Sequence, residues 1–464
     1  MSLARLIETK THLMAGKLQI TEFIFQVPID YTNPDLGSIQ LFARSATKYE
    51  KPAKLATDEE NRKSLQKPWL VYLQGGPGYG CPSPQNSNIT STILEKGYQM
   101  LYLDQRGTGQ SNPITVESLL LRGNTQEQFD YLKHFRADNI VRDCEAVRKV
   151  LTKNYPTELE KWSLFGQSFG GFCAFTYLSK YPDGLREAFI TGGIPPIGCS
   201  PDDVYQATYK KLIERNKIYY DKYPEDVPVV NKVVTHIKSL KGISLPSGIK
   251  LTVRLFLTLG RNFGFHGGLD SVHNIVLRAK TDIAQTGSIS RPTLSVIEGA
   301  LSFENNVLYA ILHEAIYCER LASNWAADRV GKKLEKFEWL SRWPNPMSET
   351  QDAAIYFSGE MIYPFLFDIS PDLKMISDLA EKIASYSDWP ELYDKFQLSR
   401  NEVPIYAATF IDDMYVDFNL TQRTVQSVKN CKQFITNSMY HNAISSKTTD
   451  VVKELFALRD DTLD

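Results

Sequence analysis

The sequence predicts an α/β fold in which a mostly parallel sheet is interrupted by a large helical insertion. Two short apolar runs, PWLVYLQGGPG from Pro68 and YQMLYLDQRGTGQS from Tyr98, each end in a glycine-rich turn. Such runs are typical of parallel strands that are buried on both faces. A third apolar run, WSLF from Trp162, leads directly into a helix-like segment. Strands that alternate with helices along the chain indicate an α/β sheet.

The segments around these strands complete the expected core. TEFIFQVPI (21–29) and SIQLFARSA (38–46) flank the turn-forming stretch DYTNPDLG, which predicts a hairpin. The charged stretch 48–67 is nearly free of large apolar residues and is expected to be a surface loop. Apolar residues recur at helical spacing between 138 and 151, with Asp138 as the expected helix cap.

The pattern changes in the middle of the chain. From about residue 201 to 341 the sequence is polar and helix-like, and strand character returns in VPIYAATFIDD (403–413) and CKQFITNSMYHN (431–442). We therefore expect a catalytic core formed by residues 1–195 and 345–464, and a helical cap formed by residues 196–344.

Composition excludes several classes of function. The chain has 52 Lys and Arg against 54 Asp and Glu, and this net charge of −2 gives no reason to expect binding to nucleic acid or to a membrane surface. The six cysteines lack Cys-x-x-Cys spacing, which argues against a zinc site and a disulfide scaffold. The first 17 residues have no apolar core of signal-peptide length, and no later segment is apolar enough to cross a bilayer. The expected location is the cytoplasm.

The stretch GQSFG fits the motif Gly-x-Ser-x-Gly and centres on Ser168. By itself the motif describes a glycine-flanked turn as well as a nucleophile. Its position between a predicted strand and a predicted helix is the context of a nucleophile elbow, in which small neighbours let the serine hydroxyl stand clear of the sheet. We therefore interpret Ser168 as a catalytic nucleophile.

A serine nucleophile needs a base and an acid, which follow it in the chain in this type of fold. Of the seven histidines, His441 alone follows the last predicted core strands. The acid is expected at the end of the preceding strand, where Asp412, Asp413 and, as a weaker candidate, Asp417 occur.

Two backbone N–H groups are needed to stabilise the developing oxyanion. One is expected from Phe169, directly after the nucleophile. The other is expected from the glycine stretch after an early strand, with Gly76 as the main candidate and Gly75 as a second.

These stretches, taken in order, resemble the prolyl aminopeptidases (proline iminopeptidases), which have the α/β-hydrolase fold. The resemblance rests on FQVPID, LFAR, QGGPG, LDQRGTGQS, GQSFGG and FIDDMYV together with the late His441, and it is strongest to the larger members, which have stretches like YAILHEAIYC and FSGEMIYPFLF. It implies release of an N-terminal proline or small residue from peptides through an acyl-enzyme, with no metal or organic cofactor. It favours Asp413 over Asp412. The family usually has a histidine where this chain has Gln74.

A substrate amine inside a closed pocket requires a carboxylate, because an unpaired buried cation is costly. The best candidate segment is SFENNVLYAILHEAIYCER (302–320). Drawn as one helix, it places Glu304 within an apolar stripe and Glu314 and Glu319 on its flanks. The resemblance, in which cap glutamates hold the amine, favours Glu304 and Glu314. The alternative is that Glu304 is a first-turn acid after a Ser302 cap and that the other two are solvated.

The zinc motif His-Glu-x-x-His fails in this segment, because Tyr317 occupies the second ligand position.

The expected partners are short peptides with a free N-terminus, and neither nucleic acid nor a membrane. Two other functions fit the same residues: an esterase or other aminopeptidase of this fold, and a hydrolase-fold binding protein without turnover. The sequence leaves open the oligomeric state and the preference for proline over alanine or hydroxyproline.

Overall fold

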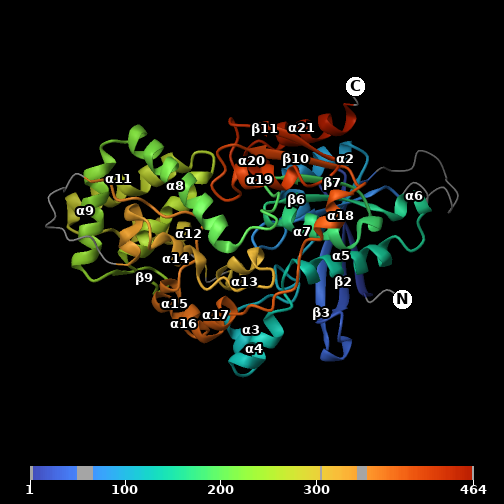
Figure 1. Ribbon diagram of the computed structural model, residues 1–464, viewed down its shortest axis with the longest axis horizontal. Coiled ribbons are helices and arrows are strands. Elements are labelled where there is room, and N and C mark those ends of the chain that lie inside the picture. Colours follow the sequence, from blue (N-terminus) through green and yellow to red (C-terminus); the bar gives the residue numbers. More distant parts are fainter. Residues whose placement is uncertain (1–3, 50–65, 302, 304–305, 342–352, 462–464) are drawn as a thin grey trace.

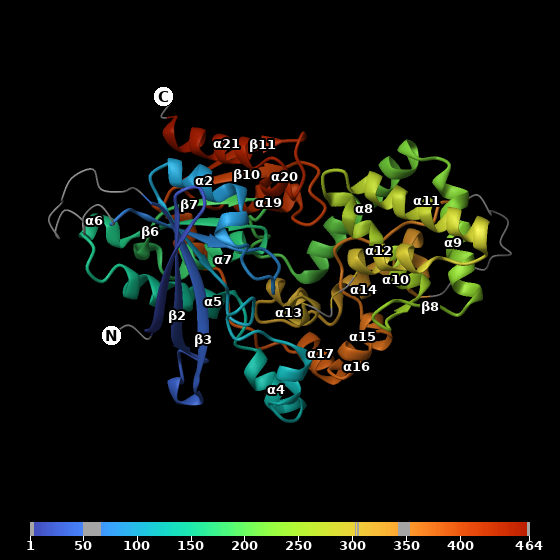
Figure 2. The same ribbon diagram turned by 180° about the vertical axis from the view of Figure 1, so that it is seen from behind.

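The structure is a computed structural model that describes residues 4–49, 66–301, 303, 306–341 and 353–461. It consists of a part built around one large sheet and a helical part beside it (Figure 1). The same arrangement is visible from behind in Figure 2. None of the described helices is both long and apolar enough to cross a membrane.

The main sheet contains nine strands among the described residues, in the order β1-β2-β3-β5-β4-β6-β7-β10-β11. The strands are β1 (Arg5–Met14), β2 (Leu18–Pro28), β3 (Ser38–Lys48), β4 (Trp69–Leu73), β5 (Gln99–Leu103), β6 (Trp162–Gln167), β7 (Leu185–Thr191), β10 (Ile405–Phe410) and β11 (Cys431–Thr436). Strands β4, β5, β6, β7, β10 and β11 are mutually parallel, whereas β1, β2 and β3 pair antiparallel, and β3 is also antiparallel to β5. The predicted mostly parallel sheet is confirmed.

The predicted hairpin is β2 and β3, in which Leu18 pairs with Lys48 and Pro28 with Ser38. These strands extend beyond the rest of the sheet as a long ribbon (Figures 1 and 2). Strand β1 was not predicted. Its residues are nearly all exposed, so it lacks the apolar alternation by which a half-buried strand is recognised.

Helices cover both faces of the parallel strands, which explains why β4, β5 and β10 are buried along their whole length. Helices α5 (Ala137–Leu151) and α7 (Phe169–Lys180) belong to the apolar cluster on one face, and α2 (Asn88–Glu95) and α21 (Thr448–Asp460) to the cluster on the other. The helix expected near 138–151 is therefore present. The expected cap is wrong, because the helix begins after Arg136 and Asp138 lies in its first turn.

The chain between β7 and β10 is mainly helical. Its longer helices are α8 (Pro201–Lys222), α9 (Asp226–Ser239), α11 (Gly268–Thr286) and α12 (Arg291–Leu301), and its shorter ones are α10 (Val253–Leu257), α13 (Val307–Leu312), α14 (Ala326–Gly331), α15 (Phe365–Ile369), α16 (Pro371–Lys374), α17 (Ser377–Ala384) and α18 (Lys395–Ser399). A short hairpin of β8 (Ile243–Ser244) and β9 (Lys250–Leu251), which was not expected, interrupts them.

Residues after 345 also contact the helical insertion. The backbone N–H of Phe357 donates to Asn216 of α8, and the N–H of Ser358 donates to the carbonyl of Leu257. The segment 356–360 therefore lies against the helical part, although it is far from α8 in the sequence. The boundaries at 195 and 345 stay a prediction.

Candidate active site

Ser168 lies at a sharp turn between β6 and α7. Its backbone angles are φ 53° and ψ −124°, a strained region for a residue with a side chain. The neighbouring glycines allow the turn: a Cβ on Gly170 would lie 1.9 Å from the carbonyl oxygen of Leu73, and one on Gly166 would lie 2.6 Å from that of Gly170. These contacts give a physical reason for both glycines of the motif.

The chain brings the three predicted catalytic side chains together. Nε2 of His441 lies 2.9 Å from Oγ of Ser168, and Nδ1 of His441 lies 2.8 Å from Oδ2 of Asp413. The three residues follow β6, β11 and β10, whose carboxyl ends meet at one edge of the sheet because the strands are parallel. That edge is where open α/β sheets form their sites.

The two adjacent aspartates have different surroundings. Asp413 is 1% exposed, and its Oδ1 accepts hydrogen bonds from the N–H groups of Tyr415 and Val416 at 2.8 and 3.0 Å. Asp412 points elsewhere: its carboxylate lies 3.5 Å from Nζ of Lys211, and its side chain is 35% exposed. Asp413 therefore has the position that is needed to orient the imidazole of His441.

His441 is buried, and the ring of Tyr415 packs 4.6 Å from its centroid. Burial by itself lowers the pKa of His441, but the charge of Asp413, its hydrogen bond and the charge of Glu360 together raise that pKa above the ordinary value for histidine. The imidazole is therefore a better base than it would be without these two carboxylates.

The expected oxyanion donors lie beside the serine. Phe169 is the first residue of α7, where backbone N–H groups lack partners within the helix. Gly75 comes so close that a Cβ on it would lie 3.1 Å from Cβ of Ser168 and 2.3 Å from the side chain of Gln167. Gly76 has a φ of 131°, which favours glycine.

A cavity of about 600 Å³ opens over the serine. Ser168, His441, Gly75 and Gly76 form part of its wall on the sheet side. Arg261, Phe265, Tyr309 and Glu360, from segments between β7 and β10, also line it.

Glu360 is the one carboxylate among the described residues that line this cavity. Its Oε1 accepts a hydrogen bond from the hydroxyl of Tyr309 at 2.5 Å, and its Oε2 lies 3.7 Å from Nε2 of His313. Burial alone would raise the pKa of Glu360, but His313, the charge of His441 and the Tyr309 hydrogen bond lower it below the usual glutamate value. Glu360 is therefore negatively charged at neutral pH.

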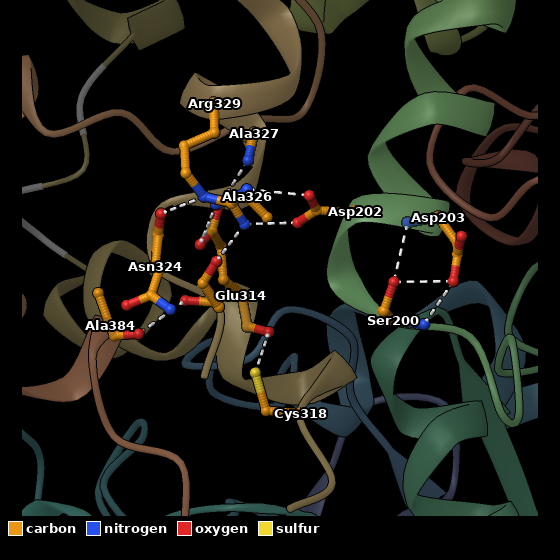
Figure 3. Close-up of polar contacts among 11 residues, drawn as sticks. Ser200, Asp202, Asp203, Glu314, Cys318, Asn324, Ala326, Ala327, Arg329 and Ala384 are labelled. Carbon is orange, nitrogen blue, oxygen red and sulfur yellow. Dashed lines mark hydrogen bonds and ion pairs between the residues drawn. The ribbon is translucent and has the colours of Figure 1, made fainter. Parts of the chain in front are cut away.

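The three predicted amine-binding glutamates are placed differently. Glu304 lies outside the described residues. Both carboxylate oxygens of Glu314 accept backbone hydrogen bonds, from the N–H groups of Ala326 at 3.0 Å and Ala327 at 2.9 Å (Figure 3). Burial raises the pKa of Glu314 in spite of these bonds.

Glu319 accepts hydrogen bonds from the N–H groups of Leu392 and Tyr393, at 2.7 and 3.0 Å. Neither Glu314 nor Glu319 is among the residues that line the cavity over Ser168. The single helix expected over 302–320 is wrong: α13 ends at Leu312, and Glu314–Tyr317 forms a separate 3-10 turn.

Sequence reasoning missed Glu360. It lies in FSGEMIYPFLF, a stretch that contributed to the family resemblance without being given a role. The sequence signal that could have pointed to Glu360 is that it is the single acidic residue in a mainly apolar stretch. What brings it to the cavity is the packing of 356–360 against the helical part, which periodicity does not reveal.

Known proteins are similar to the chain over nearly its whole length. The proline iminopeptidase aneH of Aspergillus aculeatus is 42% identical over 461 residues, which covers 99% of this chain and 98% of that protein. A proline iminopeptidase of Aeromonas sobria is 37% identical over 453 residues, with 97% and 99% covered. The chain belongs to the proline iminopeptidase family.

A family model and a solved structure were also compared with the chain. The model of the alpha/beta hydrolase fold matches residues 68–294. The crystal structure of a proline iminopeptidase from Mycobacterium smegmatis aligns with 94% of this chain and 97% of its own, with a TM-score of 0.43 and 12% sequence identity. The family-model match and the mostly parallel sheet identify the fold of this chain as the α/β-hydrolase fold.

Proposed function

We propose that the protein is a serine aminopeptidase that releases an N-terminal proline, or a similar small residue, from short peptides. The observation that carries the proposal is the hydrogen-bonded series Ser168, His441 and Asp413 at the strained turn after β6. The names of the full-length relatives support the reaction and its substrate class.

In the proposed reaction, Oγ of Ser168 attacks the carbonyl carbon of the N-terminal residue while Nε2 of His441 accepts the hydroxyl proton. Asp413 holds the imidazole through Nδ1 and stabilises its positive charge. The N–H groups of Phe169 and Gly76, with Gly75 beside them, stabilise the oxyanion. His441 then gives the proton to the leaving amine, and water activated by the same imidazole hydrolyses the acyl-enzyme.

An enzyme that cleaves only at the N-terminus of a peptide needs a group that binds the terminal amine of the substrate. Glu360 is our candidate, because its ionised carboxylate lines the same cavity as Ser168 and is held by Tyr309 and His313. A protonated terminal amine near Glu360 would be paired, whereas an acylated amine would leave that partly buried carboxylate without the substrate cation. Glu360 therefore replaces Glu314 and Glu319 as the amine-binding residue in this proposal.

The test is the rate at which p-nitroaniline is released from proline p-nitroanilide. The wild-type enzyme is expected to hydrolyse it, and Ser168→Ala to lose at least about three orders of magnitude in kcat while keeping the wild-type melting temperature. A fluorophosphonate should label the wild-type enzyme and not the variant. Full turnover by Ser168→Ala would refute the assigned nucleophile.

A further inference from the structure

The proposed reaction makes no use of Arg261, although this residue lines the cavity that contains Ser168. Arg261 belongs to the 3-10 segment Thr258–Gly264 of the helical part. Its guanidinium lies 4.9 Å from the centre of the Phe303 ring. Its backbone carbonyl accepts a hydrogen bond from the hydroxyl of Tyr415, the residue that packs on His441. The base of this side chain is thus fixed relative to the catalytic histidine.

Among the described residues, the guanidinium of Arg261 has few acceptors. It carries five N–H donors. Within the described part of the chain, its one hydrogen bond goes from Nη2 to the carbonyl of Ala300 at 3.5 Å, and it forms no ion pair with a described carboxylate. Arg106, by contrast, makes two hydrogen bonds of 2.7 Å to Asp143. A partly enclosed guanidinium with donors that no described residue accepts favours an anionic ligand.

We propose that Arg261 binds the C-terminal carboxylate of a short peptide substrate. This inference rests on the proposed function. Glu360 and Arg261 give the cavity wall one negative and one positive group, which match the two charged ends of a short peptide whose scissile carbonyl lies at Ser168. Guanidinium and carboxylate pair through two parallel hydrogen bonds, so the contact would select a free carboxylate over an amide. A cavity of about 600 Å³ has room for a peptide of a few residues.

The experiment compares kcat/KM for Pro-Ala and Pro-Ala-Ala with kcat/KM for their C-terminal amides. The wild-type enzyme is expected to prefer the free acid of at least one peptide by about tenfold or more. Arg261→Gln should reduce that ratio to about one. Arg261→Lys keeps the positive charge but cannot donate the two parallel hydrogen bonds of a guanidinium, so it should retain part of the preference. The ratio is internal to each variant, so a general loss of activity does not affect it.

Arg254→Gln is the matched control. Arg254 lies on α10 of the same helical part and does not line the cavity. The acid-to-amide ratio of the Arg254→Gln variant should therefore equal that of the wild type. An acid-to-amide ratio within twofold of one for both wild-type peptides would overturn the proposal without any variant. So would an unchanged ratio in Arg261→Gln.

Two further substrates separate the remaining explanations. If Arg261 instead binds an acidic side chain, Pro-Glu amide will be preferred over Pro-Gln amide in an Arg261-dependent way, which would overturn the assignment to the chain terminus. Proline p-nitroanilide has no carboxylate and reports the proposed function by itself. An enzyme that hydrolyses it without preferring free acids refutes the role of Arg261 alone, whereas an enzyme inactive on every substrate refutes both.

Discussion

At the scale of single residues, the site depends on small differences in the surroundings of identical side chains. Asp412 and Asp413 are neighbours, yet one pairs with Lys211 near the surface and the other is buried against His441. Among the glutamates, Glu360 faces the cavity and is held ionised by His313, His441 and Tyr309, whereas Glu314 is occupied by two backbone N–H groups.

The aspartate pair gives a direct prediction. Asp413→Asn should lower kcat by about 10³ to 10⁴, because an amide cannot stabilise the imidazolium and favours the wrong tautomer. Asp412→Asn, the matched control one residue away, should stay within about twofold of wild type, since a surface ion pair contributes little. The measurement is steady-state hydrolysis of proline p-nitroanilide. Equal losses in the two variants would contradict the assignment.

Glu360 is expected to influence the pH dependence of the reaction as well as substrate binding. Its negative charge contributes to the raised pKa of His441. Because the base must be neutral to accept a proton, removing that charge lowers the pKa of His441 and extends activity to lower pH. In Glu360→Gln, the acidic limb of the kcat/KM profile on a neutral ester such as p-nitrophenyl acetate should therefore move to lower pH. If the acidic limb of the Glu360→Gln profile stays at the wild-type pH or moves to higher pH, the coupling between Glu360 and the pKa of His441 is refuted.

At the scale of secondary structure, the parallel strands explain why residues from distant parts of the chain meet. Ser168, Asp413 and His441 each follow a strand whose carboxyl end lies at the same sheet edge. Chain order and strand patterns therefore predicted Ser168 and His441 and limited the acid to Asp412, Asp413 or Asp417. The family resemblance favoured Asp413, and the structure brings its side chain to His441. The same reasoning failed for 302–320, because the helix stops at Leu312 and the carboxylate of Glu314 instead binds the start of α14.

The turn into α7 depends on close contact with β4. In Gly170→Ala, the new methyl group would lie 1.9 Å from the backbone oxygen of Leu73, which cannot move away as a side chain could. We expect a loss of about 1–3 kcal/mol in the free energy of unfolding, or more, together with loss of activity. The measurement is chemical denaturation.

Gly299→Ala is the control for that substitution. Gly299 lies within α12, and a Cβ there would meet nothing within 4 Å. Alanine is favoured over glycine in a helix by about 1 kcal/mol, so this variant should be as stable as wild type or more stable. If both variants behave alike, steric contact with Leu73 is not the reason for Gly170.

At the scale of the whole molecule, the site lies between the sheet edge and segments that cover it from the helical part. The sheet-side residues could be predicted because motifs and strand order constrain them. Glu360 and Arg261 could not, since their approach depends on how 356–360 and 258–264 pack onto the fold. Strand β1 was missed for a simpler reason: an exposed edge strand has no apolar face to reveal it.

The long β2–β3 ribbon is joined to the rest of the molecule by a buried ion pair. Arg106 lies 2.7 Å from Asp143 of α5, both side chains are at most 2% exposed, and Arg106 also donates to the backbone oxygens of Pro28 and Ile29 near the end of β2. Asp143→Asn should cost about 3–5 kcal/mol of stability, because it leaves a buried guanidinium without its counter-ion. Thermal and urea denaturation provide the measurement.

The exposed pair of Asp130 and Lys133 is the control for that experiment. Its charged atoms lie 2.8 Å apart, a similar distance, but the two side chains are 50% and 31% exposed. Asp130→Asn should change stability by less than about 1 kcal/mol. A similar loss in both variants would mean that burial does not determine the contribution of the Arg106 pair.

The most direct test of the central claim, a serine peptidase that requires a free N-terminal amine, is the ratio of kcat/KM for proline p-nitroanilide to that for its N-acetyl form. We predict a large ratio for the wild type and a ratio reduced by at least about tenfold in Glu360→Gln, because the variant no longer has the carboxylate that pairs with the amine. Comparable turnover of both compounds by the wild type would contradict the claim and assign the same triad to a hydrolase without selection for a chain end.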